Sequence, residues 1–65
     1  MTKEMLETYL FLNGFKYVEG KIWSYWWKDQ LSVEFRDNEI KMCSDKIYET
    51  HLGYQSAFNE LEKII

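Results

Sequence analysis

The chain has 65 residues, of which 46% are hydrophobic and 18% aromatic, and its formal net charge is −3. A chain of this length forms one domain with a small core, and its many large rings are expected to supply most of the packing. An excess of acidic side chains does not favour unaided binding to nucleic acid, which needs a basic surface. No apolar stretch approaches the roughly 20 residues of a membrane span.

Cys43 is the only cysteine and His51 the only histidine. One thiol forms no intramolecular disulfide, and the two side chains together are too few for a zinc site. The first residues, Met1 to Glu4, lack the charged and apolar regions of a signal peptide. We therefore expect a cytoplasmic protein that has no contact with a membrane, binds no cofactor and keeps its thiol reduced.

Residues 2–12 are predicted to form a helix. Helical spacing links its apolar residues Met5, Leu6, Tyr9 and Leu10. Thr2 suits the N-cap, and Asn13-Gly14 supplies a left-handed stop. Phe11 points away from the apolar stripe. We expect it to fold back under the following strand; if it is exposed instead, it offers a contact point for a partner.

From Phe15 to about Cys43 the hydrophobic period changes to two, which predicts antiparallel strands. Turn signals divide this segment at Glu19-Gly20, Asp29-Gln30 and Asp37-Asn38. We predict an α+β fold, with a single small domain over residues 1–65. Its meander of three to four strands lies between an N-terminal and a C-terminal helix, in the order α-β-β-β-β-α, with both helices packed on one face.

The register of the meander depends on the lengths of its turns. One register satisfies three-residue loops at Val18-Glu19-Gly20 and Lys28-Asp29-Gln30 and a two-residue turn at Asp37-Asn38. Its inner face is uncharged and consists of Phe15, Tyr17, Trp23, Tyr25, Trp27, Leu31, Val33, Phe35, Ile40 and Met42. Trp26 then lies on the outer, polar face. The alternative is a two-residue turn at Asp29-Gln30, which exposes Trp23, Tyr25 and Trp27 together.

The last dozen residues have clear helical periodicity. Their apolar stripe consists of Tyr54, Ala57, Phe58, Leu61, Ile64 and Ile65. This helix is expected beside the first one on the inner face. For the connector from Asp45 to Leu52 we predict a short amphipathic helix that Ser44 caps and Gly53 closes, with a structured loop as the alternative.

The outer face supplies the candidate binding site, because an exposed tryptophan in an apolar patch is typical of protein interfaces. The predicted contact residues are Trp26, Ile22, Val18, Lys28, Arg36 and Phe11. In the competing interpretation, the stems of Lys28 and Arg36 or the connector shield Trp26. We hypothesise a small non-catalytic module that binds another protein, or a second copy of itself as a homodimer, through this face.

Such a module acts by occupancy, as an adaptor or as an inhibitor of a larger protein. Size, acidity and a composition typical of AT-rich genomes suggest a phage or mobile-element protein that inhibits a nucleic-acid-processing host protein. The second hypothesis is a nucleic-acid-binding module with Trp26 stacking on bases. Its backbone contacts are Lys16, Lys28, Arg36 and Lys41. Glu34 and Glu39 lie among these cations, and in the predicted register Glu34 faces Lys41 and Arg36 faces Glu39. Cross-strand charge pairing is therefore the competing interpretation, which needs no ligand.

Catalysis has little support in the sequence. Cys43 and His51 are the only side chains with an obvious nucleophile or base role, and neither lies in a recognisable motif. A catalytic dyad also needs a third group that orients the histidine. We expect His51 to pack in the connector and Cys43 to be an inert sheet residue, so no enzyme is predicted.

Overall fold

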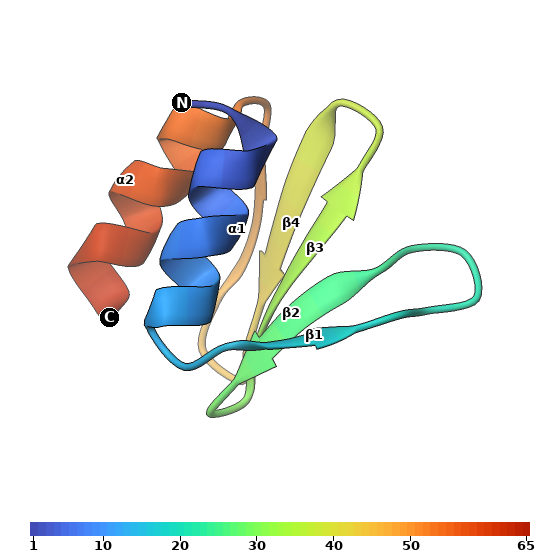
Figure 1. Ribbon diagram of the computed structural model, residues 1–65. Helices are drawn as coiled ribbons and strands as arrows, with labels where there is room; N and C mark the ends of the chain where they lie inside the picture. Colours follow the sequence, from blue (N-terminus) through green and yellow to red (C-terminus); the bar gives the residue numbers. More distant parts are fainter.

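The computed structural model describes residues Met1 to Ile65 and contains two helices and one sheet. The elements are α1 (Lys3–Leu12), β1 (Lys16–Val18), β2 (Tyr25–Lys28), β3 (Leu31–Arg36), β4 (Glu39–Cys43), β5 (Tyr48–His51) and α2 (Tyr54–Ile64). The sheet is an antiparallel meander of order β1-β2-β3-β4-β5. Both helices lie side by side over one face, here called inner, and no helix covers the outer face (Figure 1). The predicted α+β fold is confirmed, with one strand more than expected. Neither helix has the length and apolar character needed to cross a membrane.

The helix α1 begins and ends at the predicted signals. The Thr2 hydroxyl accepts a hydrogen bond from the Met5 N–H at 3.2 Å, as an N-cap residue does. Gly14, just beyond the helix, has a φ of 89°, which favours glycine. Leu6 and Leu10 are fully buried.

The helix α2 packs with its predicted stripe toward the sheet. Ala57 and Leu61 are fully buried, whereas the last two residues of the stripe are nearly half exposed. The ring of Phe58 meets the ring of Tyr9 on α1 edge-on, with 4.8 Å between the centroids. This contact fixes the two helices against each other.

The strand β2 turns the opposite set of side chains toward the core from the set that we predicted. Trp26 lies opposite Val33 on the inner face, and Trp27 lies opposite Ser32 on the outer face. The predicted register of this strand is therefore wrong, and its alternative is correct. A shift of one residue in pairing exchanges every side chain between the two faces.

The turn between β2 and β3 explains this orientation. Asp29 and Gln30 both have positive φ, at 48° and 69°. Two such residues form a type I′ turn, whose twist matches that of the flanking strands. The hairpin therefore has a two-residue turn where we predicted a three-residue loop.

The first hairpin is longer than predicted. Tyr17 lies opposite Trp26, and residues 19–24 form the connection, so the predicted three-residue loop is wrong. Gly20 does not have the positive φ that the glycine of such a three-residue loop has. It is required for another reason, because a Cβ at this position would overlap the carbonyl oxygen of Trp23. The hairpin projects away from the helices (Figure 1).

The connector after β4 forms β5, so both the predicted helix and the alternative loop are wrong. The Ser44 hydroxyl accepts hydrogen bonds from the N–H groups of Lys46 and Ile47, as predicted for a helix cap. The same geometry closes a hairpin turn here, because the Ser44 N–H donates to the Ile47 carbonyl at 2.9 Å. The predicted turn at Asp37-Asn38 is confirmed by the register of β3 and β4.

The core is apolar throughout. Its buried residues are Leu6, Leu10, Phe15, Trp26, Val33, Ile40, Met42, Ala57 and Leu61. No polar or charged residue is buried, and no buried side-chain polar atom lacks a hydrogen bond. All polar and charged side chains are therefore at least partly accessible at the surface.

Candidate binding surface

Trp26, the predicted centre of the site, belongs to the core. Its side chain is 9% exposed, and its indole N–H donates to Glu7 Oε2 on α1 at 3.2 Å. The ring of Tyr17 meets it edge-on, with 5.3 Å between the centroids. A buried indole N–H needs an acceptor, and α1 provides one. The expectation that Trp26 is exposed on the outer face is therefore wrong.

Trp27 occupies the outer-face position that we predicted for Trp26, and it is 44% exposed. Its cross-strand neighbours are Lys16 on β1 and Ser32 on β3. The row continues through Cys43 to Tyr48, which is 77% exposed. Because neighbouring strands are about 4.8 Å apart, Trp27 and Tyr48 stand roughly 14 Å apart. The small side chains of Ser32 and Cys43 lie between them in this row.

The adjacent row of the outer face lies beside this one. From β1 to β5 it consists of Val18, Tyr25, Glu34, Lys41 and Thr50. Val18 and Tyr25 are half-buried, and Lys41 Nζ donates to Thr50 Oγ1 at 3.1 Å. We call these two rows together the aromatic face. It consists of Lys16, Trp27, Ser32, Cys43, Tyr48, Val18, Tyr25, Glu34, Lys41 and Thr50.

Most charges on the outer face are already paired. Arg36 forms an ion pair with Glu34, and its guanidinium lies 5.5 Å from the centroid of the Trp23 ring. Lys41 Nζ is 3.8 Å from a carboxylate oxygen of Glu39. The predicted cross-strand positions are correct, but these ion pairs run along the strands and not across them. Lys16, beside Trp27, forms no ion pair.

The other predicted contact residues do not gather on one surface. Ile22 is 80% exposed in the loop 19–24. Lys28 turns toward α1, where its Nζ donates to the Asn13 carbonyl at 2.6 Å and lies 5.9 Å from the Phe15 ring centroid. Phe11 is 66% exposed on α1, so the expectation that it folds back under the next strand is wrong. Both Lys28 and Phe11 lie away from the aromatic face.

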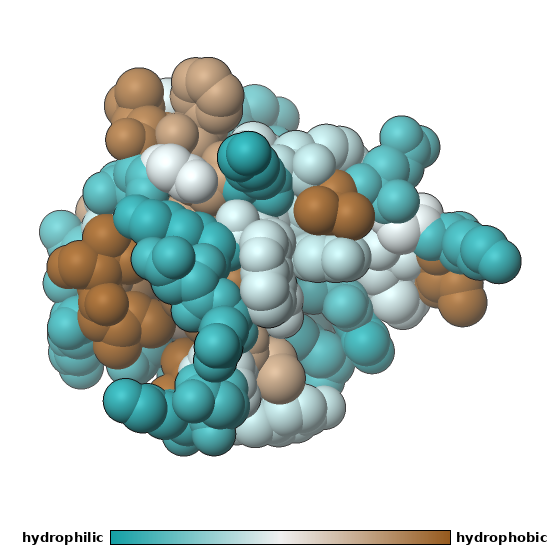
Figure 2. Space-filling view, turned by 90° about the horizontal axis from the view of Figure 1, so that it is seen from below, coloured by the Kyte–Doolittle hydropathy of each residue, from teal (hydrophilic) through white to brown (hydrophobic).

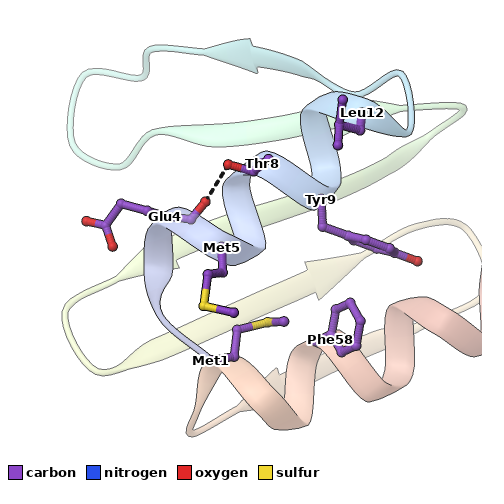
Figure 3. A pocket seen from close by; sticks show the side chains of 7 residues that line it. All are labelled: Met1, Glu4, Met5, Thr8, Tyr9, Leu12 and Phe58. Atoms are coloured by element: carbon purple, nitrogen blue, oxygen red, sulfur yellow. Dashed lines mark hydrogen bonds between the residues drawn. The ribbon is translucent and has the colours of Figure 1, made fainter.

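A second apolar surface, which the sequence analysis missed, lies on the helical side. It is an open groove of about 470 Å³ between α1 and α2 (Figure 3). Its lining residues are Met1, Glu4, Met5, Thr8, Tyr9, Leu12 and Phe58. The Thr8 hydroxyl donates to the Glu4 carbonyl at 2.8 Å, so the walls are mostly apolar. Met5 and Leu12, seven residues apart, were the available signal for a second stripe on this helix.

Further apolar side chains are exposed where both helices end. A view from below shows them at this end of the helical layer (Figure 2). They include Leu12, Ile64 and Ile65. The molecule thus exposes apolar side chains on the helical side as well, and the aromatic face is the surface that the sheet forms.

His51 lies between two hydrogen-bond partners. Its Nδ1 is 2.7 Å from Ser56 Oγ, and its Nε2 is 2.9 Å from Glu49 Oε1. Hydrolase triads also link serine, histidine and a carboxylate. Here the chain of bonds ties β5 to the first turn of α2, and neither His51 nor Ser56 lines any of the five surface hollows. Cys43 lies on the opposite face of the sheet from His51, so the two form no dyad.

Comparisons with known proteins do not assign either surface. No protein-family model matches the chain, and neither a curated protein nor a solved structure matches it.

Proposed function

We propose that this protein is a small non-catalytic module that binds another protein through the aromatic face and acts by occupancy. The observation that carries the proposal is the exposure of Trp27 and Tyr48 on a sheet face that no helix covers. Tryptophan and tyrosine are the residues that most often anchor protein interfaces. A rigid sheet holds these rings in place, so little entropy is lost when a partner binds.

The aromatic face also limits the chemistry of its partner. The position between Trp27 and Tyr48 suits an apolar side chain of the partner, because the Ser32 hydroxyl there already donates to the Cys43 carbonyl at 3.3 Å. Lys16, opposite Trp27 on β1, forms no ion pair. A complementary partner surface therefore presents an apolar side chain flanked by a carboxylate.

The effect of this module on its partner is a further part of the proposal. The module acts as an adaptor or as an inhibitor of a larger protein. A phage or mobile-element origin and inhibition of a nucleic-acid-processing protein remain hypotheses from size, acidity and composition. Most acidic residues lie off the aromatic face, so an inhibitor of a basic surface would use another side of the molecule. We propose a cytoplasmic location because the only cysteine is a free thiol.

The test compares two exposed aromatic residues on opposite sides of the sheet. Wild type, Trp27→Ala and Phe11→Ala, each tagged, are used to capture proteins from the source cell, and the recovered partner is purified and titrated by calorimetry. We expect Trp27→Ala to weaken binding by about 30-fold or more, equivalent to about 2 kcal/mol. Phe11→Ala is expected to leave the affinity unchanged. A partner that binds the Trp27 variant as tightly as wild type would refute the site.

A second candidate, single-stranded nucleic acid, is favoured by the same open sheet face. RNA-recognition modules stack bases on aromatic residues of an uncovered sheet, and Lys16 next to Trp27 is free to contact a phosphate. Titration with DNA and RNA oligonucleotides, followed by tryptophan fluorescence, tests it. Binding that falls steeply between about 50 and 200 mM salt supports this candidate, and no binding at the lower salt rejects it.

A further inference from the structure

The strand β5 lies at an open edge of the sheet. Thr50 in its middle is exposed, and Tyr48 and the following Leu52 are 77% and 80% exposed. Edge strands present free backbone groups, and many proteins protect them with proline, lysine or a bulge. Residues 48–51 have neither proline nor lysine, and they pair with β4 in unbroken register.

The alternation of hydrogen bonds decides which backbone groups face this edge. Ser44 donates its N–H to the Ile47 carbonyl, which makes these two residues the hydrogen-bonded pair that closes the hairpin. Hydrogen-bonded and non-hydrogen-bonded pairs alternate along antiparallel strands. In the register of β4 and β5, the N–H and C=O groups of Glu49 and His51 therefore point toward β4. Those of Thr50 point toward the free edge.

We propose that β5 pairs in antiparallel fashion with β5 of a second copy of this chain, about a two-fold axis at Thr50. In this arrangement Thr50 forms two backbone hydrogen bonds with Thr50 of the second copy. Glu49 lies opposite His51 of that copy, and Tyr48 lies opposite Leu52. The sequence Tyr48-Glu49-Thr50-His51-Leu52 is thus self-complementary, with apolar, acidic, neutral, basic and apolar side chains in turn.

Neighbouring registers lack this complementarity. A two-fold axis at Glu49 places the two Glu49 carboxylates opposite each other, and like charges in that position are destabilising. An axis midway between two residues would pair inner with outer side chains, which a continuous sheet does not allow. At Thr50, the dimer covers the most exposed apolar side chains of this edge and adds a cross-strand partner for each Glu49 and His51, which already contact each other at 2.9 Å.

The dimer has a consequence for the outer side of the molecule. Because both copies keep the same face outward, their aromatic faces join into one surface, with both Tyr48 rings near the axis. A partner with two matching sites would bind such a dimer more tightly than a monomer. The edge pairing itself depends on backbone groups of β5 and not on Trp27.

Light scattering and sedimentation across a concentration series test the pairing. We expect a wild-type dimer that dissociates on dilution. Thr50→Pro removes an N–H that faces the edge and leaves the ladder to β4 intact, so it is expected to raise the dimer dissociation constant at least about tenfold. Thr50→Val is the matched control. It also loses the hydroxyl contact to Lys41 but keeps the N–H, and it is expected to dimerise like wild type.

A cross-link gives a second readout that does not depend on proline being tolerated. In a Cys43→Ser background, Thr50→Cys places two thiols at a hydrogen-bonded pair whose Cα atoms are about 5.5 Å apart, which suits a disulfide. Mild oxidation is expected to yield a covalent dimer, whereas Tyr48→Cys in the same background yields little. A wild type that stays monomeric at every concentration, or a dimer that Thr50→Pro leaves unchanged, would overturn the proposal. Neither result affects the affinity test of Trp27.

Discussion

Trp26 and Trp27 are consecutive residues of β2, so their side chains lie on the two different faces of the sheet. Trp26 is buried under α1 and donates its indole N–H to Glu7, whereas Trp27 is half exposed beside Lys16 on the uncovered side. The two side chains are chemically identical. The difference therefore arises from the register of β2, and register is set by the turn that follows the strand.

The inner and outer positions differ in the hydrogen-bond acceptor that they offer to an indole N–H. Only a ring under α1 can donate to the carboxylate of Glu7, which satisfies its indole N–H within the protein. Trp27 has no such acceptor among the protein hydrogen bonds, and its side chain is 44% exposed. One tryptophan thus belongs to the core, and the next one is half exposed on the uncovered face.

The largest expected effect comes from removing each ring in turn. Trp26→Ala leaves a cavity between β2 and α1 and is expected to lower the free energy of unfolding by about 3–5 kcal/mol. Trp27→Ala removes a half-exposed side chain and is expected to cost about 1 kcal/mol or less. Urea unfolding followed by circular dichroism measures both. Equal losses, or a larger loss for Trp27→Ala, would contradict the orientation of β2.

A smaller effect is expected from the carboxylate that accepts the Trp26 bond. Glu7→Ala leaves a part-buried donor without a partner and is expected to destabilise the protein by about 1–3 kcal/mol. Glu7→Gln keeps an acceptor oxygen and is expected to cost less. The same unfolding assay in a Trp26→Phe background provides the control, because no indole N–H remains there. If Glu7→Ala costs as much in that background, the hydrogen bond does not explain the effect.

The helices were predictable because each is defined by local signals. Thr2 supplies the cap of α1, Gly14 its stop, and a stripe centred on Leu61 defines α2. Each signal acts within a few residues and does not depend on the rest of the fold. The antiparallel meander was predictable for a similar reason, because its period of two extends over many residues.

The orientation of β2 was not predictable, because two registers differ by one residue of turn length. Neither Asp29 nor Gln30 is a glycine, the usual signal of a type I′ turn. The correct register also places Lys28 on the inner side, opposite Leu31, which is an unfavourable position for a charged side chain. The structure resolves the conflict by directing the Lys28 amine to the Asn13 carbonyl at the end of α1.

The wrong register of β2 also affected the predicted binding site. The sequence identified an aromatic strand with one set of rings facing out, and this is correct, but the expectation that Trp26 faces out was wrong, because Trp27 does. β5 was missed because four residues are too few to show a period, and the Ser44 signal fits a hairpin turn as well as a helix cap. The edge of the sheet was therefore not visible in the sequence.

The smallest expected effect tests the turn at Asp29-Gln30, which determines whether Trp26 or Trp27 is buried. Gln30 has a φ of 69°, a conformation that costs residues with a Cβ about 1–2 kcal/mol and glycine very little. Because glycine also loses more chain entropy on folding, we expect Gln30→Gly to stabilise the protein by a net of about 0.5–1 kcal/mol. This corresponds to a rise in the midpoint of thermal unfolding of about 2–8 °C.

Gln55→Gly is the matched control for this substitution. Gln55 is exposed in the first turn of α2, where glycine is expected to lower the stability by up to about 1 kcal/mol. Opposite signs for the two substitutions would show that residue 30 needs the left-handed conformation. A loss of stability at both positions would contradict the two-residue turn at Asp29-Gln30. The three-residue loop would then return as the better explanation, and with it the register that places Trp27 in the core and Trp26 outside.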